Sequence, residues 1–264
     1  MELFMNENIF REYDIRGVVD NDFNDNLIIS LGKAFGTILI ENNFNTMSIS
    51  GDVRSTTNDL KKNFIKGALE VGINVCDMGV LPTPVNYFSL FNTDIVNSVQ
   101  ITGSHNPSEY NGFKLSLNKK PFYGKSIQKL KKIILNNSYH NAKNIGKVNK
   151  IKILDEYVDF VSKNISINKD LKIAIDCANA VACVVAPHLF KNMNIDTKEL
   201  YCDIDPRFPN HHPDPTVDDN LVDLIKLVKK EKCDFGISFD GDADRLVAVD
   251  ENGLIIRSDI LISL

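Results

Sequence analysis

The sequence predicts an α/β protein made of two successive three-layer α/β/α domains with mixed, largely parallel sheets. Segments with apolar residues at helical spacing alternate with short strand-like apolar runs, which is typical of this class. The alternation restarts after a polar stretch near the middle of the chain, and 264 residues suit two domains of ordinary size. A hydrophobic content of 43% is enough for two cores and excludes a disordered chain.

The first domain is expected over residues 1–145. Two amphipathic helices are predicted where apolar residues recur every three or four positions, after Asn26 and before Gly72. Strands are expected at 47–50, 73–78 and 95–101. The asparagine-rich segment 135–148 has no clear period, so it is predicted to be a surface connection that marks the domain boundary.

The second domain is expected over residues 146–254. The predicted order is a strand at 171–176, helices at 181–192 and 221–231, and a strand at 235–239, followed by a hairpin of 246–250 and 254–256 around Asn252-Gly253. From Ser258 onward the pattern predicts a further helix that Ser258 or Asp259 can cap. Residues 255–264 are therefore expected to open a third, truncated domain.

Charge and cysteine content narrow the class of protein. The net charge of -5 comes from interspersed acidic and basic residues, which gives no electrostatic footprint for nucleic acid or membrane. The five cysteines are scattered without a C-x-x-C pair, which favours neither a disulfide framework nor zinc. The N-terminus lacks the features of a signal peptide, and no apolar run approaches the roughly 20 residues of a membrane span. A cytoplasmic protein with small-molecule or protein partners is predicted.

Three carboxylates, Asp240, Asp242 and Asp244, alternate with small residues and are followed by Arg245. This D-x-D-x-D spacing suits a hard divalent cation, and Mg²⁺ is favoured because it keeps positions for phosphate oxygens or water. A calcium loop of the EF-hand type fails because Arg245 replaces the required glycine and the flanks are strand-like. A solvated hairpin tip remains the bland alternative, although three clustered acids repel one another without a cation.

The segment Thr102-Gly103-Ser104-His105-Asn106-Pro107 places one hydroxyl in a turn of small residues, which we expect to be exposed. A serine activated by a neighbouring base or metal can carry a phosphoryl group, although Gly-Ser-His also occurs in ordinary turns. Phosphoryl transfer needs positive charge around the moving group. Arg16, Lys114, His105 and Arg245 are the candidates, although single basic residues are more often solvated surface charges.

Four segments together resemble the α-D-phosphohexomutases, in the order found in that family. They are residues 10–17, residues 102–107 with 110–114, the run Pro-Asn-His-His-Pro-Asp-Pro at 209–215, and residues 240–245. The bacterial phosphomannomutase/phosphoglucomutase branch is the most similar. Gly103 and Ala243 favour it over the phosphoglucosamine mutase branch, which usually has alanine and glycine at these positions.

The resemblance implies a role for each matching residue. Ser104 would be phosphorylated in the resting enzyme, and its phosphate would join Asp240, Asp242 and Asp244 as ligands of Mg²⁺. His105 and Lys114 would flank the phosphoserine as catalytic residues, together with Arg16. Tyr13, Arg16, Lys114 and Arg245 would bind the substrate, and Lys114 or Arg16 would handle the hydroxyl proton.

The implied reaction is that of an intramolecular phosphotransferase of carbohydrate metabolism. It would convert a hexose 1-phosphate to its 6-phosphate through a bound hexose 1,6-bisphosphate. The family has four domains, and the last two supply sugar- and phosphate-recognition loops that this sequence lacks. We therefore expect phosphoserine and magnesium chemistry with little mutase turnover, and full turnover of glucose 1-phosphate by the 264-residue chain would contradict that expectation.

Other interpretations stay open. One is a metal-dependent phosphohydrolase with Asp240 as the nucleophile, and another is a non-catalytic module that binds sugar phosphates or metal. A metal pair at His211 and His212 is disfavoured because adjacent side chains in a proline-rich extended segment point apart. The segment 176–183 also departs from the family, since it lacks the glycines usual after that strand.

Overall fold

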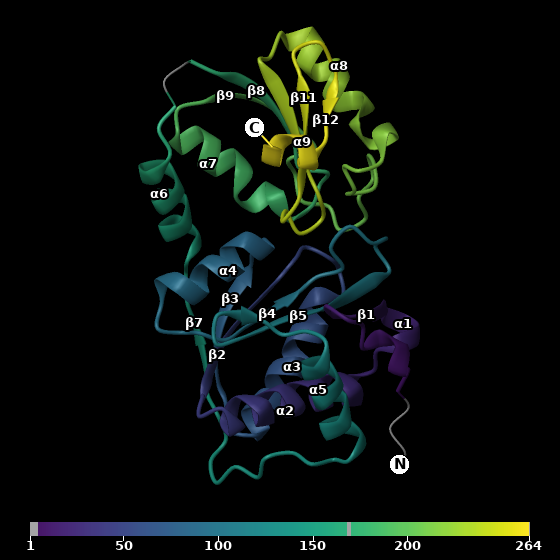
Figure 1. Ribbon diagram of the computed structural model, residues 1–264, viewed down its shortest axis with the longest axis vertical. Coiled ribbons are helices and arrows are strands. Elements are labelled where there is room, and N and C mark those ends of the chain that lie inside the picture. Colours follow the sequence, from purple (N-terminus) through teal and green to yellow (C-terminus); the bar gives the residue numbers. More distant parts are fainter. Residues whose placement is uncertain (1–4, 168–169, 264) are drawn as a thin grey trace. The chain divides into compact units, whose positions relative to one another are not determined.

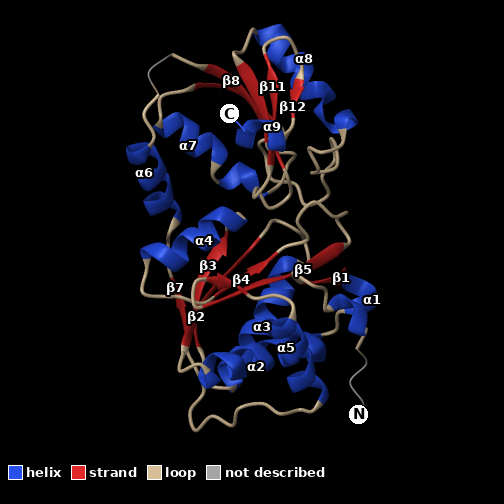
Figure 2. Cartoon of the chain, viewed as in Figure 1, coloured by secondary structure: helices blue, strands red, loops and turns tan. Residues whose placement is uncertain are grey.

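The computed structural model describes residues 5–167 and 170–263, which form two compact units. Among the described residues, the first unit contains 5–79, 86–103 and 109–152, and the second contains 80–85, 104–108, 153–167 and 170–263. Both units are of the α/β class (Figure 2). Two short segments from the first half of the chain, 80–85 and 104–108, thus belong with the second unit.

A mixed sheet forms the centre of the first unit. Its strands run in the order β1-β5-β4-β2-β3-β7, with β6 paired to β5. β2 is parallel to β4 and β3 to β7, whereas β5 is antiparallel to β1 and β4. The strands span β1 Ile15–Val18, β2 Thr46–Gly51, β3 Asn74–Val80, β4 Ser98–Ile101, β5 Tyr110–Leu117, β6 Lys120–Pro121 and β7 Val148–Lys150.

Helices cover both faces of this sheet (Figure 1). α2 (Asp25–Glu41), α3 (Thr57–Glu70) and α5 (Lys125–Leu135) enclose an apolar core that includes Met47 and Ile49 of β2. Side chains alternate along a strand, so Ser48 and Ser50 face α4 (Thr83–Asn92), where hydrogen bonds join them to Ser89 and Asn86. The short elements are η1 (Glu7–Ile9) and α1 (Val19–Asp22).

The second unit has a five-stranded sheet in the order β12-β11-β10-β8-β9. β8 is parallel to β9 and β10, and β11 is antiparallel to β10 and β12. Ala174 of β8 packs in the cluster under α8, while Ile173 and Ile175 pack in the opposite cluster with α7 residues. The elements are α6 Leu154–Asn164, β8 Lys172–Asp176, η2 Val181–Val184, α7 Ala186–Asn192, β9 Asp196–Leu200, η3 Asp218–Leu221, α8 Val222–Glu231, β10 Phe235–Phe239, β11 Leu246–Asp250, β12 Ile255–Ile256 and α9 Ser258–Ser263.

The single helix expected at 181–192 is wrong. The segment is a 3₁₀ helix, Val181–Val184, followed by α7 from Ala186. Pro187 lies in the first turn of α7, where a backbone N–H has no partner within the helix. In a continuous helix that began at Val181, the same residue would lie in the interior, where its missing N–H would leave a carbonyl without a donor. The expectations for Met1–Phe4 and for Leu264 fall outside the described residues.

The cysteines and the helices also bear on the sequence predictions. All five cysteines are free thiols. Within residues 5–167 and 170–263, no helix combines the length and the apolar character that crossing a bilayer requires.

Candidate active site

The acidic loop, residues 240–245, joins the antiparallel strands β10 and β11. Asp240 and Asp242 are fully buried, and Asp244 is exposed. One oxygen of each lies within 4.8 Å of the others, and Ala243 at φ 57° turns the chain so that the three carboxylates converge. Hard, clustered carboxylate oxygens are the donor set that Mg²⁺ prefers, so these residues fit that ion.

Asp240 is the most heavily engaged of the three acids. Its carboxylate accepts from Arg245 Nε at 3.1 Å and Nη2 at 2.6 Å, and from the Asp244 N–H at 3.1 Å. Burial raises the pKa of Asp240 to about 7, and the Asp242 and Asp244 carboxylates add to the rise while Arg245 opposes it. The loop therefore holds more negative charge than Arg245 alone neutralises, which is the condition that a bound cation relieves.

Ser104 lies against this loop. Its Oγ accepts from Arg245 Nη2 at 3.0 Å and lies 3.3 Å from Asp240 Oδ2 and 3.4 Å from His105 Nδ1. Arg245 Nη2 also contacts His105 Nδ1, so one guanidinium joins the serine, the histidine and the acid. Ser104 and Arg245, both predicted from the sequence as site residues, are thus in contact although they are 141 positions apart.

The expected exposure of the Ser104 hydroxyl is wrong, because the residue is only 3% exposed. Arg245 and Asp240 enclose its side chain. Its φ of 52° is in the left-handed region, which is uncommon for a residue with a side chain and costs about 1–3 kcal/mol. The surrounding contacts therefore determine where this hydroxyl points.

Gly241 explains how the serine and acidic loops pack so closely. A Cβ at this position would lie 2.1 Å from the Ser104 carbonyl oxygen. The Gly241 N–H also donates to the Pro213 carbonyl at 3.1 Å, which adds the proline-rich segment 209–215 to the same junction. Only a residue without a side chain allows the three segments to meet here.

Within the proline-rich segment, both ring nitrogens of His211 lie within hydrogen-bonding distance of protein oxygens. Its Nε2 lies 2.9 Å from Asp176 Oδ2, and its Nδ1 lies 2.9 Å from the His212 carbonyl oxygen. Burial would lower the pKa of His211, but the Asp176 carboxylate and the His212 carbonyl outweigh it and raise the pKa above its ordinary value. His211 thus ties the segment to the end of β8.

A buried network of hydrogen bonds, centred on Asp52, precedes Ser104 and was not predicted from the sequence. Asp52 accepts from Thr102 Oγ1 at 2.8 Å and from the Gly103 N–H at 3.2 Å, and it forms a 3.1 Å ion pair with Arg54. Arg54 donates to the Tyr110 carbonyl at 3.1 Å, and a Cβ on Gly103 would lie 2.5 Å from its guanidinium carbon. This pair fixes the backbone on both sides of residues 104–108. The polar Asp-x-Arg directly after β2 was the available signal.

The remaining predicted residues belong to the first unit. Arg16 of β1 lies opposite Gly112, two positions from Lys114 on β5, so Arg16 and Lys114 share one face of the sheet. Arg16 forms an ion pair with Asp14. Tyr13 is 77% exposed, and its ring centroid lies 6.3 Å from that of Tyr123.

Comparisons with known proteins agree on one family. Residues 7–141 match phosphoglucomutase/phosphomannomutase, alpha/beta/alpha domain I, and residues 155–253 match domain II of the same family. A phosphomannomutase/phosphoglucomutase from Pseudomonas aeruginosa is 38% identical over 97% of this chain and 55% of that protein. A phosphoglucomutase from Neisseria meningitidis serogroup B is 38% identical over 95% of this chain and again 55% of its own length.

A solved structure gives the same result. The crystal structure of a phosphoglucomutase/phosphomannomutase family protein from Burkholderia thailandensis superposes with a TM-score of 0.92 at 35% identity. The superposition covers 96% of this chain and 57% of the Burkholderia chain. The chain thus spans somewhat more than half the length of the relatives it matches, and it belongs to the phosphoglucomutase/phosphomannomutase family, of which it carries the α/β/α domains I and II.

Proposed function

We propose that this chain carries the phosphoserine and the metal-binding loop of a phosphohexomutase that interconverts hexose 1-phosphates and 6-phosphates. The observation that carries the proposal is the Ser104 hydroxyl held by Arg245 beside the buried carboxylate of Asp240. The named relatives are phosphomannomutases and phosphoglucomutases, which supports hexose phosphates as substrates. The phosphoserine loop would belong to a domain over 1–145 and the metal-binding loop to one over 146–254.

In the proposed reaction, the bond between phosphorus and Ser104 Oγ breaks while a bond forms to the free hydroxyl of a hexose monophosphate. The product is a hexose 1,6-bisphosphate, whose other phosphate then returns to Ser104 and leaves the isomeric monophosphate. Net phosphorylation of the protein is unchanged. Arg245 would orient the phosphoryl oxygens, and Lys114 or Arg16 would handle the hydroxyl proton.

Asp240, Asp242 and Asp244 would hold Mg²⁺ together with an oxygen of phosphoserine 104. When bound, the ion supplies positive charge that stabilises the charge developing on the phosphoryl group. His105 would hold its place beside Ser104 through Arg245. Tyr13, whose side chain is exposed, would contact the sugar phosphate. We place the protein in the cytoplasm, where such substrates occur.

The proposal is tested by the fate of a labelled phosphoryl group. Protein incubated with Mg²⁺ and glucose 1,6-bisphosphate carrying radioactive phosphate is freed of ligand and mixed with unlabelled glucose 6-phosphate. Return of the label to the sugar as a bisphosphate supports a mutase. Release of the label as inorganic phosphate supports the phosphohydrolase alternative, and sugar binding without any labelling of the protein supports a non-catalytic module.

A further inference from the structure

Thr83 makes two hydrogen bonds to the middle acid of the loop. Its backbone N–H donates to the Asp242 carbonyl at 3.0 Å, and its hydroxyl donates to Asp242 Oδ2. Both residues are fully buried and belong to the same unit, although 159 positions separate them. One residue therefore holds the main chain and the side chain of Asp242 together.

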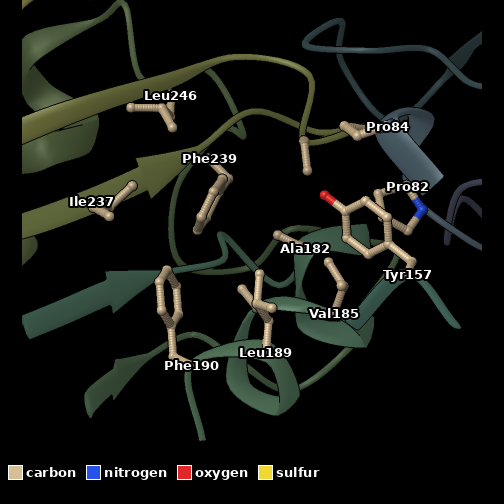
Figure 3. A pocket seen from close by; sticks show the side chains of 12 residues that line it. Pro82, Pro84, Tyr157, Ala182, Val185, Leu189, Phe190, Ile237, Phe239 and Leu246 are labelled. Carbon is tan, nitrogen blue, oxygen red and sulfur yellow. The ribbon is translucent and has the colours of Figure 1, made fainter. Parts of the chain in front are cut away.

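The neighbours of Thr83 and two residues in or next to the acidic loop line one apolar cavity. Pro82, Pro84 and Leu246 line a cavity of about 140 Å³ (Figure 3). Ala243 lines the same cavity. Proline has a restricted φ and no N–H, so Thr83 supplies the backbone donor of this Pro-Thr-Pro segment. The contacts that join this segment to Asp242 are therefore the two hydrogen bonds of Thr83.

Arg245 contacts two of the three acids, Asp240 and Asp244, whereas Thr83 contacts Asp242. Arg245 and the backbone of the loop hold Asp240, and Arg245 Nε also lies 3.5 Å from Asp244 Oδ1. Thr83 comes from outside the loop, from the beginning of α4, and contributes a neutral donor. A neutral donor orients a carboxylate without cancelling the charge that attracts a cation.

We propose that Thr83 is a positioning residue for the cation site, in which its hydroxyl fixes the rotation of the Asp242 carboxylate. This inference rests on the proposed function only through the assignment of Asp242 as a metal ligand. A carboxylate already oriented by a hydrogen bond loses less freedom when it binds a metal. Loss of such an outer hydrogen bond usually weakens metal affinity about 10- to 100-fold.

Thr83→Val tests the proposal because valine keeps the shape and the backbone N–H and removes only the hydroxyl. Binding of Mn²⁺, as a spectroscopic probe, is measured on the unphosphorylated chain by electron paramagnetic resonance, with Mg²⁺ in competition. The expected result is a dissociation constant raised about 10- to 100-fold, with Thr83→Ser restoring tight binding. Thr37→Val is the matched control, because Thr37 is also buried and donates through its hydroxyl, to the Lys33 carbonyl in α2.

Phosphorylation of Ser104 by glucose 1,6-bisphosphate gives a second readout. In Thr83→Val the Mg²⁺ concentration for half-maximal rate should rise, while the rate at saturating Mg²⁺ stays near that of the unmodified chain. In an Asp242→Asn background, removal of the Thr83 hydroxyl should change Mn²⁺ binding no further, since the two side chains act as one unit. Urea unfolding of each variant separates this effect from a loss of folding.

The outcomes distinguish the two claims. Equal Mn²⁺ affinity in Thr83→Val and in the unmodified chain overturns the positioning role and leaves the proposed function in place. A serine variant that binds as weakly as the valine variant also overturns it. If the unmodified chain binds no divalent cation, the metal-site assignment and the inference fail together.

Discussion

At the residue scale, the site centres on the guanidinium of Arg245. It contacts Ser104, His105 and Asp240 together, and its ion pair is with a carboxylate that is fully buried. Burial disfavours the charged form of Arg245, but the three aspartates outweigh it and raise its pKa further. Arg245 is therefore a fixed positive charge at the oxygen that would carry the phosphoryl group.

Arg245→Gln should slow phosphoryl transfer to Ser104 by about 10²- to 10³-fold, the usual effect of deleting one oriented donor at a developing charge. The rate of Ser104 phosphorylation by hexose bisphosphate, followed by intact-mass analysis, measures this. Arg207→Gln is the control, since Arg207 pairs with Asp205 but is 81% exposed on its side chain. Similar rates in both variants would contradict the role given to Arg245.

The His211–Asp176 pair predicts a pH dependence of stability. Because folding raises the pKa of His211 above its unfolded value of about 6.5, the stabilisation is complete below that value. It is lost as the pH rises through the folded pKa. The free energy of unfolding should therefore fall with rising pH above about 6.5, and His211→Gln should flatten this slope. Urea titrations of both chains across neutral pH check the sign, and a parallel slope in His211→Gln would refute it.

At the element scale, the sequence predicted the elements whose burial is one-sided and regular. α2 and α3 bury a long apolar stripe, and β8, β10 and the β11–β12 hairpin have apolar runs between turn residues. α4 carried no such signal, because its Asn86 and Ser89 form hydrogen bonds with Ser50 and Ser48 on the sheet face that the helix covers. β9 is an edge strand with no fully buried residue, so its sequence is mostly polar.

The site was predictable to the extent that its chemistry is local in sequence. Three alternating acids and a serine between glycine and histidine are visible as short patterns. The contacts of Arg245 with Ser104 and of Thr83 with Asp242 join residues more than 130 positions apart, and no local pattern encodes them. Ser104 is buried beside Arg245 and Asp240, which are distant in sequence, and this is why a turn-based prediction of exposure was wrong.

Substitution of Gly241 tests whether the serine loop and the acidic loop need their close contact. In Gly241→Ala the new methyl group would meet the Ser104 carbonyl, so the chain should lose roughly 1–3 kcal/mol of stability and most Ser104 phosphorylation. Gly79→Ala serves as the comparison, because it has open space around the added methyl group but a φ of +82°. That variant should lose stability through backbone strain and keep phosphorylation. Full phosphorylation of Gly241→Ala would show that the loops do not need this close contact.

At the scale of the whole molecule, the chain contains the two family domains that carry the serine and acidic loops. Ser104–Ser108 group with the second unit, so the serine, Arg245 and the three aspartates lie within one compact unit. The boundary at 145–146 and a third domain opening at 255 stay predictions. The proposal that Ser104 carries the phosphoryl group beside the acidic loop therefore depends on this one unit.

Mapping the phosphate after incubation with Mg²⁺ and glucose 1,6-bisphosphate tests that claim most directly. Peptide mass spectrometry of the unmodified chain should place one phosphate on Ser104, stable to hydroxylamine, and Ser104→Ala should acquire none. Chelation of the metal should abolish the labelling. A hydroxylamine-sensitive acyl phosphate on Asp240, or equal phosphorylation of Ser104→Ala, would contradict the account.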